Sequence, residues 1–209
     1  MSEVINIKEL NERIERESVF VDTLRAEMSK VIVGQSHLVD TLLIGLLSNG
    51  HILLEGVPGL AKTLAINTLA NIVDAKFSRI QFTPDLLPSD ITGINYFNMK
   101  KSEFEFVPGP VFSNVLLVDE INRATPKTQA GLLECMEELQ ATTDGTTREI
   151  KAPFMVIATQ NPIESMGVFP LPEAQLDRFL IKANMEYPTH AESTAILKRF
   201  NGANPLSDI

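Results

Sequence analysis

One short segment of this sequence carries the residue types and spacing needed to hold a phosphate group. The segment is GVPGLAKT (56–63), which follows a short apolar run and opens a helical pattern. In that context, backbone N–H groups of a loop and of a helix N-terminus point toward a phosphate. Lys62 would then bridge the β- and γ-phosphates of a nucleotide, and the Thr63 hydroxyl would hold Mg²⁺. Taken alone, the segment also fits a glycine-rich turn from a strand to a helix.

The residue before the lysine departs from the general phosphate-loop pattern, which has glycine where this chain has Ala61. We expect alanine to be tolerated there if the residue has helical φ. The sequence therefore predicts nucleotide contacts from Gly56, Val57, Pro58, Gly59, Leu60, Ala61, Lys62, Thr63 and Leu64.

A second segment, VLLVDE, places two acids at the end of an apolar run (114–120). The run is apolar enough for a strand buried on both faces, and ligands of open α/β sheets sit at the carboxyl ends of such strands. Asp119 would hold the magnesium shell through water, and Glu120 would polarise the attacking water in phosphoryl transfer. The alternative is two acids that only mark a strand end, which the phosphate-binding pattern upstream disfavours.

Two further polar residues stand beside predicted strands. Asn161 in IATQNP follows a strand that should neighbour the Asp119 strand, so its amide could orient water or contact the γ-phosphate. Arg178 in PEAQLDRF follows a short helix, and it is either an arginine finger for a neighbouring subunit, an exposed arginine or a partner for Asp177. An asparagine in an Asn-Pro turn is the alternative for Asn161.

The elements that must position these residues alternate along the chain. Strands are predicted at 51–56, 79–82, 114–120, 153–159 and 178–185. Helices are predicted from Ile5 to Met28 with a break near Glu17 to Ser18, from His37 to Leu47, from Lys62 to about Val73, and from Thr125-Pro126 to about Gln140. This alternation predicts an α/β fold with a five-stranded parallel sheet covered by helices on both faces.

Two inserted β-hairpins interrupt this alternation, at Tyr96–Val107 and at Ala141–Ile150, where Asp144-Gly145 is a strong turn signal. Thr189-x-x-Glu192 is a capping box that should open one more helix. A lone terminal helix buries its apolar face poorly, so we expect a truncated chain at this end.

Composition narrows the class of protein. The net charge is −9, which disfavours a broad nucleic-acid-binding surface. Cys135 is the single cysteine and fits the buried face of a helix, and the scattered histidines make zinc chemistry improbable. No apolar run approaches the ~18 residues needed to cross a bilayer, and the first residues lack a signal peptide's apolar block. A cytoplasmic protein is expected.

The sequence resembles the AAA+ ATPases, and within them the MoxR family, from about Val31 to Phe200. The resemblance rests on these segments: GVPGLAKT, QFTPDLLPSDITG (81–93), VPGPVF (107–112), LLVDEINRATPKTQAGLLECMEE (116–138), IATQNP (157–162) and LPEAQLDRF (171–179). It implies a P-loop AAA+ core over residues 1–186, with a helical segment at 1–30, and the first part of a helical lid over 187–209.

The resemblance also implies ATP and Mg²⁺ as cofactors. Residues of VIVGQ would contribute to the adenine pocket, namely Ile32, Val33, Gly34 and Gln35. Asn161 matches the sensor-1 position, and Arg178 matches an arginine finger acting in trans. Both hairpins would face the central pore of a homo-oligomeric, usually hexameric, ring. Such proteins remodel or mature protein clients, often beside partners with a von Willebrand factor A domain.

Three functions follow from these residues. The first is an ATPase that remodels proteins. The second is a nucleic-acid-dependent motor, which Lys100, Lys101 and Arg148 on the hairpins would support, although we prefer solvated charge as the explanation for these residues. The third is a nucleotide switch without turnover, which the combination of Glu120, Asn161 and Arg178 disfavours.

Overall fold

The computed structural model describes residues 7–56, 61–161 and 167–200. Five parallel strands form the central sheet in the order β2-β5-β8-β1-β9. Their bounds are β1 (His51–Glu55), β2 (Phe77–Gln81), β5 (Val115–Asp119), β8 (Met155–Gln160) and β9 (Phe179–Asn184). The prediction of a five-stranded parallel sheet is confirmed.

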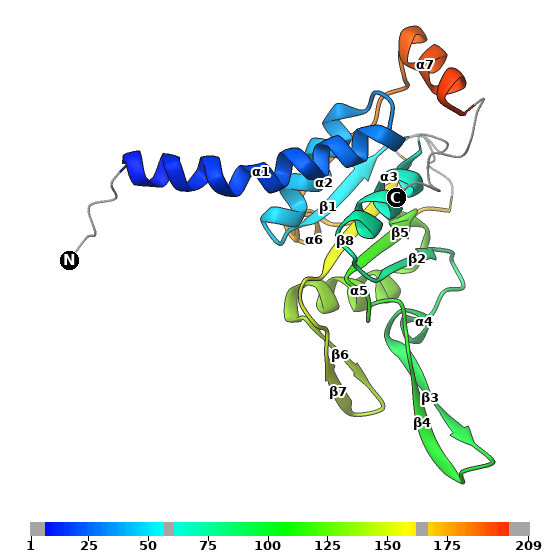
Figure 1. Cartoon of the computed structure of the whole chain (residues 1–209). Helices are drawn as coiled ribbons and strands as arrows, with labels where there is room; N and C mark the ends of the chain where they lie inside the picture. The colour runs from blue at the N-terminus through cyan, green and yellow to red at the C-terminus, as the bar shows by residue number, and fades with distance from the viewer. Residues whose placement is uncertain (1–6, 57–60, 162–166, 201–209) are drawn as a thin grey trace.

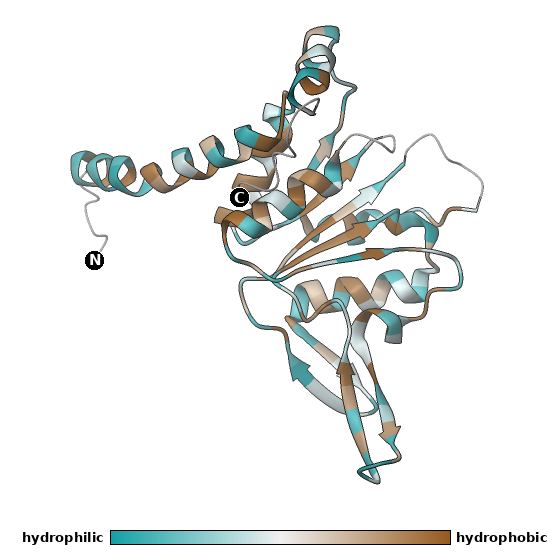
Figure 2. Ribbon diagram, turned by 45° about the vertical axis from the view of Figure 1, so that its right-hand side comes forward, coloured by the Kyte–Doolittle hydropathy of each residue, from teal (hydrophilic) through white to brown (hydrophobic). Residues whose placement is uncertain are grey.

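Helices cover both faces of this sheet because its strands are apolar on both sides. On β5, Val115 and Leu117 belong to one hydrophobic cluster, whereas Leu116 and Val118 belong to the other. The first cluster includes side chains of α1 (Ile7–Val31), α2 (Ser36–Leu47) and α3 (Lys62–Ile72), and the second those of α4 (Pro88–Thr92) and α5 (Pro126–Glu138). Figure 2 shows the brown strands between these helical layers.

Helix α1 runs without interruption, so the predicted break near Glu17 to Ser18 is wrong. The segment contains no glycine or proline, and the Arg13–Glu17 ion pair (2.8 Å) and the Ser18 Oγ bond to the Glu15 carbonyl (3.0 Å) bridge the expected break. The shift in apolar spacing instead marks where the helix leaves the body. Only Leu24, Met28 and Val31 of its side chains are buried, and the N-terminal half projects away from the sheet (Figure 1). The part of the predicted helix before Ile7 lies outside the described residues.

Two hairpins extend from the sheet, as predicted: β3 (Gly93–Asn98) with β4 (Glu103–Pro108), and β6 (Gln140–Thr143) with β7 (Thr146–Glu149). Asp144 (φ 50°) and Gly145 (φ 74°) form the turn between β6 and β7, and two successive left-handed residues are typical of a type I′ hairpin turn. Both hairpins project from the same side of the body (Figure 1). The shorter elements are η1 (Ile121–Arg123) and α6 (Glu173–Leu176).

The two hairpins contact each other. Asn95 Nδ2 on β3 donates to Asp144 Oδ2 at the β6–β7 turn (2.9 Å). The Arg148 guanidinium on β7 lies 3.7 Å from the centroid of the Phe106 ring on β4, a cation–π contact. Contacts at both places hold the hairpins together as one unit.

Helix α7 (His190–Phe200) begins with the predicted capping box. The Thr189 amide donates to Glu192 Oε2 (2.7 Å), and the Glu192 amide donates to Thr189 Oγ1 (3.3 Å). Arg199 Nη1 donates to the Ser29 carbonyl (2.6 Å) and so ties α7 to the end of α1. The remainder of the predicted lid segment, residues 201–209, lies outside the described residues. Within the described part of the chain, no helix has the length and apolar character needed to span a membrane.

Candidate nucleotide-binding site

A cavity of about 570 Å³ lies where β1, β5 and β8 end. These strands are neighbours in a parallel sheet, so the residues that follow them meet at one edge. Eight of the residues predicted from the sequence line the cavity: Gly56, Ala61, Lys62, Thr63, Leu64, Asp119, Glu120 and Asn161. Predicted contacts from Val57, Pro58, Gly59 and Leu60 lie outside the described residues.

Lys62 is half-buried at the start of α3, with its ammonium group inside this set of residues. Its Nζ donates to the Gly56 carbonyl at 3.0 Å, which closes the phosphate-loop segment. Burial lowers the pKa of Lys62, while the charges of Asp119 and Glu120 oppose that shift. The cavity therefore holds a cation and two carboxylates within electrostatic reach of one another.

Ala61 has a left-handed backbone (φ 56°, ψ 21°), so the expectation of helical φ at this position is wrong. The residue is the N-cap of α3 and lies outside the right-handed helix, although its carbonyl already accepts a hydrogen bond from the Ala65 amide (3.0 Å). A left-handed non-glycine residue costs roughly 1–2 kcal/mol, and such strain often marks functional sites.

The Asp119 carboxylate is held by side chains from both neighbouring strands. Arg79 Nε on β2 donates to Oδ2 (2.7 Å), and Thr159 Oγ1 on β8 donates to Oδ1 (3.3 Å). The same Thr159 oxygen accepts a hydrogen bond from the Glu120 amide (3.0 Å). Thr159 therefore fixes both acidic residues at the end of β5.

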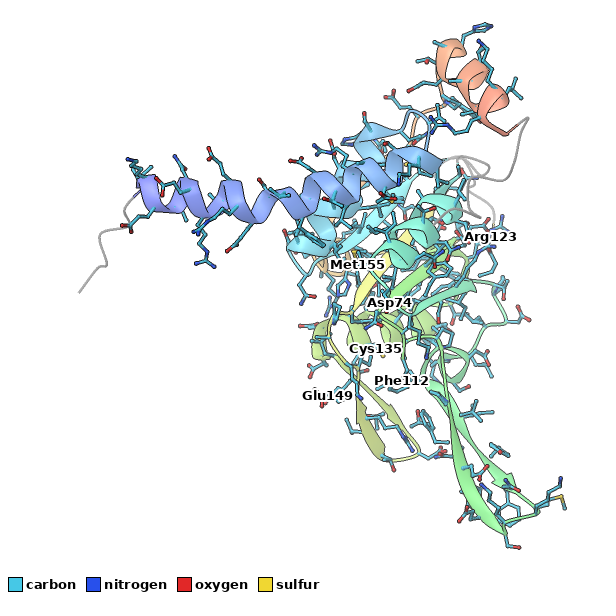
Figure 3. The ribbon with its side chains drawn as sticks, viewed as in Figure 1. Asp74, Phe112, Arg123, Cys135, Glu149 and Met155 are labelled. Carbon is cyan, nitrogen blue, oxygen red and sulfur yellow. The ribbon has the colours of Figure 1, made fainter. Side chains whose placement is uncertain are left out.

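Glu120 also has a left-handed backbone (φ 56°) and begins the 3-10 turn η1. Its Oε2 atom lies 2.9 Å from Arg123 Nε, and the side chain remains about one third exposed. Figure 3 shows Arg123 at this end of the sheet, whereas Cys135 lies on α5. Glu120 thus reaches the cavity with a carboxylate that water can approach.

Asn161 and Arg178 occupy different places. Asn161 follows β8 and lines the cavity, and the residues after it, 162–166, lie outside the described part of the chain. Arg178 lies between α6 and β9 and does not line that cavity. Its partner is Glu137 on α5 (2.5 Å) rather than Asp177, so the predicted alternative partner is wrong.

Of the four residues predicted for the adenine pocket, one lines a second cavity and none lines the first. Gln35 lines a second cavity of about 610 Å³, and its Nε2 donates to the Glu186 carbonyl (3.4 Å). Gly34 has a left-handed φ of 67°, which favours glycine, and it lies against the end of the Glu192 side chain. Ile32 is buried in the core, and Val33 is half-buried.

Four lining residues were missed by the sequence interpretation: Arg79, Gln81, Thr159 and Gln160. Polar residues at alternating positions of RIQF place Arg79 and Gln81 on one face of β2, and Gln81 lies in register with Asp119. That alternation indicated a polar face on this strand, but the sequence did not indicate that the strand would pair with β5.

The donor atoms fit a magnesium nucleotide better than a protein-held metal. No group of three or more His, Cys, Asp or Glu residues within the described ranges could hold a metal ion. Mg²⁺ instead prefers a few oxygen ligands combined with water and phosphate oxygens, and Thr63 and Asp119 offer one hydroxyl and one carboxylate in the cavity. Cys135 is not a candidate nucleophile or metal ligand, because burial raises the pKa of its thiol to about 12.

Known proteins resemble this chain in sequence and in fold. Residues 51–181, more than half of the chain, match the ATPase family associated with various cellular activities (AAA). The chain is 54% identical over 179 residues to "Chaperone MoxR1" of Mycobacterium tuberculosis, covering 86% of this chain and 48% of that protein. It is 32% identical over 191 residues to "Protein MoxR" of Methylorubrum extorquens, covering 87% and 55%.

A solved structure of a candidate ATPase from Cytophaga hutchinsonii is 48% identical and superposes with a TM-score of 0.84, covering 96% of this chain and 61% of that one. The fold and the family match define an AAA ATPase core. The chain belongs to the MoxR family of AAA ATPases. It spans about half the length of the curated relatives that it matches.

Proposed function

We propose that this chain binds ATP with Mg²⁺ in the cavity at the ends of β1, β5 and β8 and hydrolyses it to ADP and phosphate. The observation that carries the proposal is the convergence of Lys62 and Thr63 with Asp119 and Glu120 on one cavity. A lysine and a hydroxyl at a helix start suit a triphosphate, and two carboxylates at a strand end suit its metal and its attacking water.

Each residue then has a distinct role. Lys62 binds the β- and γ-phosphates, while Thr63 and Asp119 are the groups that would hold Mg²⁺. When bound, the metal supplies positive charge that neutralises the phosphate oxygens. Glu120 accepts the proton of the attacking water, and Asn161 orients that water or contacts the γ-phosphate. The α7 helix begins a lid over residues 187–209, and residues 1–186 form the core.

Hydrolysis is proposed to occur at the interface between copies of this chain in a ring. Arg178 lies outside its own protomer's cavity, which suits a residue that acts on a neighbouring subunit's ATP. The name of the mycobacterial relative, a chaperone, supports the remodelling of protein clients. We place this activity in the cytoplasm. A partner with a von Willebrand factor A domain belongs to the same proposal.

A nucleic-acid motor has less support. Two of the three basic residues that favoured it are engaged within the protein: Lys101 pairs with Glu105, and Arg148 lies on the Phe106 ring. The net charge of −9 also opposes phosphate-backbone binding.

ATP binding tests the proposal directly. Lys62→Ala should weaken binding of a fluorescent ATP analogue by roughly 10- to 100-fold, since a hydrogen bond to a charged group is worth about 1.5–3 kcal/mol. Lys76→Ala is the matched control, because Lys76 precedes β2 at the opposite end of the sheet and donates to the Phe112 carbonyl. Equal affinity in native protein and Lys62→Ala would refute the site.

A further inference from the structure

Arg79 is the side chain of the cavity whose role the proposed function leaves open. It comes from β2, which pairs with β5 in parallel, and its Nε donates to Asp119 Oδ2 at 2.7 Å. The Asp119 side chain is 15% exposed and that of Arg79 is 52% exposed. The arginine can therefore move into solvent, whereas the aspartate is confined.

The ion pair competes with the function assigned to Asp119. Both carboxylate oxygens already accept hydrogen bonds, Oδ2 from Arg79 and Oδ1 from Thr159. The Thr159 contact is the longer, at 3.3 Å, but the Thr159 hydroxyl is itself held by a hydrogen bond from the Glu120 backbone amide. Arg79 is consequently the partner that can leave Asp119 at the smaller structural cost.

We propose that Arg79 is a positioning residue that controls how readily Asp119 enters the magnesium shell. Its guanidinium orients the carboxylate and must release Oδ2 before that oxygen can face the metal's water. Arg79 thereby reduces the energetic coupling between Mg²⁺ and ATP binding. This inference rests on the proposed function, because it assumes that ATP and Mg²⁺ bind in this cavity.

A purely structural role for the pair explains less. β2 and β5 are already joined by a continuous parallel register from Phe77↔Val115 to Gln81↔Asp119, so the strands do not need a side-chain link. Because the Arg79 side chain is 52% exposed, water screens the pair, and we expect it to contribute little to stability. Replacing Arg79 should accordingly leave the fold intact.

The test uses a fluorescent ATP analogue to measure the dissociation constant in EDTA and in excess Mg²⁺. The quantity compared between variants is the ratio of the constant in EDTA to the constant in Mg²⁺. A change in metal-independent affinity for the triphosphate alters both dissociation constants alike and therefore cancels, to first order, in the ratio. Arg79→Gln should raise the ratio on the order of threefold, the scale expected for loss of a half-exposed ion pair. Arg25→Gln is the matched control, because Arg25 forms an Arg–Asp pair of the same length with Asp40 (2.7 Å, 54% exposed) remote from the cavity.

A second pair of variants assigns the effect to Asp119. In an Asp119→Asn background, Arg79→Gln should leave the ratio unchanged, because the competition has been removed. The inference is overturned if Arg79→Gln leaves the ratio unaltered in otherwise native protein, or if it still changes the ratio in the Asp119→Asn background. In either case the proposed function stands as long as the native protein binds ATP. Native protein that binds no ATP under either condition overturns both.

Discussion

Arg178 is held by Glu137 within its own protomer. Its Nη2 and Nε atoms lie 2.5 Å and 2.9 Å from Glu137 Oε2, and its Nη1 donates to the Ala174 carbonyl (2.8 Å). The pair joins the end of α6 to α5, two elements that are far apart in the chain, and it presents a partly exposed guanidinium outside the cavity at the ends of β1, β5 and β8. A residue in this position can act on a neighbouring subunit without being part of its own site.

The first prediction separates the structural role of Arg178 in the ion pair with Glu137 from its proposed role in a neighbouring subunit's site. Arg178→Ala should reduce ATP turnover by roughly 10³-fold or more, the scale known for arginine fingers, without weakening ATP binding to isolated protomers. Glu137→Ala breaks the same ion pair but keeps the guanidinium, so it should retain most of the turnover. Equal losses in the two variants would assign the effect to the ion pair. Native turnover per protomer should also rise with protein concentration, as a shared site requires.

The second prediction concerns the proposed base. Glu120→Gln keeps the size of the side chain but cannot accept a proton from water, so turnover should fall roughly 10²–10⁴-fold while ATP affinity changes little. Glu149→Gln, a surface change on β7, is the control for loss of one negative charge. Single-turnover hydrolysis and equilibrium binding of labelled ATP measure the two quantities. Unchanged hydrolysis in Glu120→Gln would remove this residue from the base role.

The third prediction follows from the buried His51 at the start of β1. The Val156 amide donates to its Nδ1 (3.0 Å), so its Nε2–H donates to the Met136 carbonyl (3.2 Å), and the ring packs edge-on against Phe154. These contacts require a neutral ring, and burial lowers the pKa of His51 despite the opposing Met136 bond.

A lowered folded-state pKa means that the unfolded chain takes up this proton first as the pH falls. The stability contributed by neutral His51 is therefore complete above the unfolded pKa of about 6.5 and is lost below it. Between pH 7.5 and 5.5 the native free energy of unfolding should fall by at most about 1.4 kcal/mol through this group. His51→Gln should have a smaller difference between the two pH values in urea unfolding, and an identical difference would refute the assignment.

The sheet was predictable from the sequence because its central strands are largely apolar. Runs such as that of β5 are buried on both faces, and this leaves a parallel sheet between helices as the simplest arrangement. Asp119, Glu120 and Asn161 were predictable as neighbours for the same reason, since each follows a strand at one edge of that sheet.

The residues that were missed or misjudged depend on contacts across the chain. Arg79 becomes a partner of Asp119 only through the pairing of β2 with β5, which local patterns do not specify. The left-handed backbone of Ala61 opposes the intrinsic preference of alanine, so local propensity could not predict it. The continuous α1 shows that a shift in apolar spacing marks the end of burial as well as the end of a helix.

The fourth prediction concerns the coupling of the two hairpins. Arg148→Gln removes the cation–π contact with Phe106, worth about 0.5–1 kcal/mol at an exposed site. The Asn95–Asp144 hydrogen bond remains, so the hairpins should loosen without unfolding. Amide hydrogen exchange should accelerate roughly two- to fivefold in both β3–β4 and β6–β7.

Lys100→Gln is the matched control for this experiment, because it removes one positive charge at the turn of the β3–β4 hairpin, a position with no part in the Arg148–Phe106 contact. Exchange in this variant should equal that of the native protein outside the turn itself. Faster exchange confined to β6–β7 in Arg148→Gln would show that the hairpins move independently. Acceleration in both hairpins would show that the Arg148–Phe106 contact stabilises both of them.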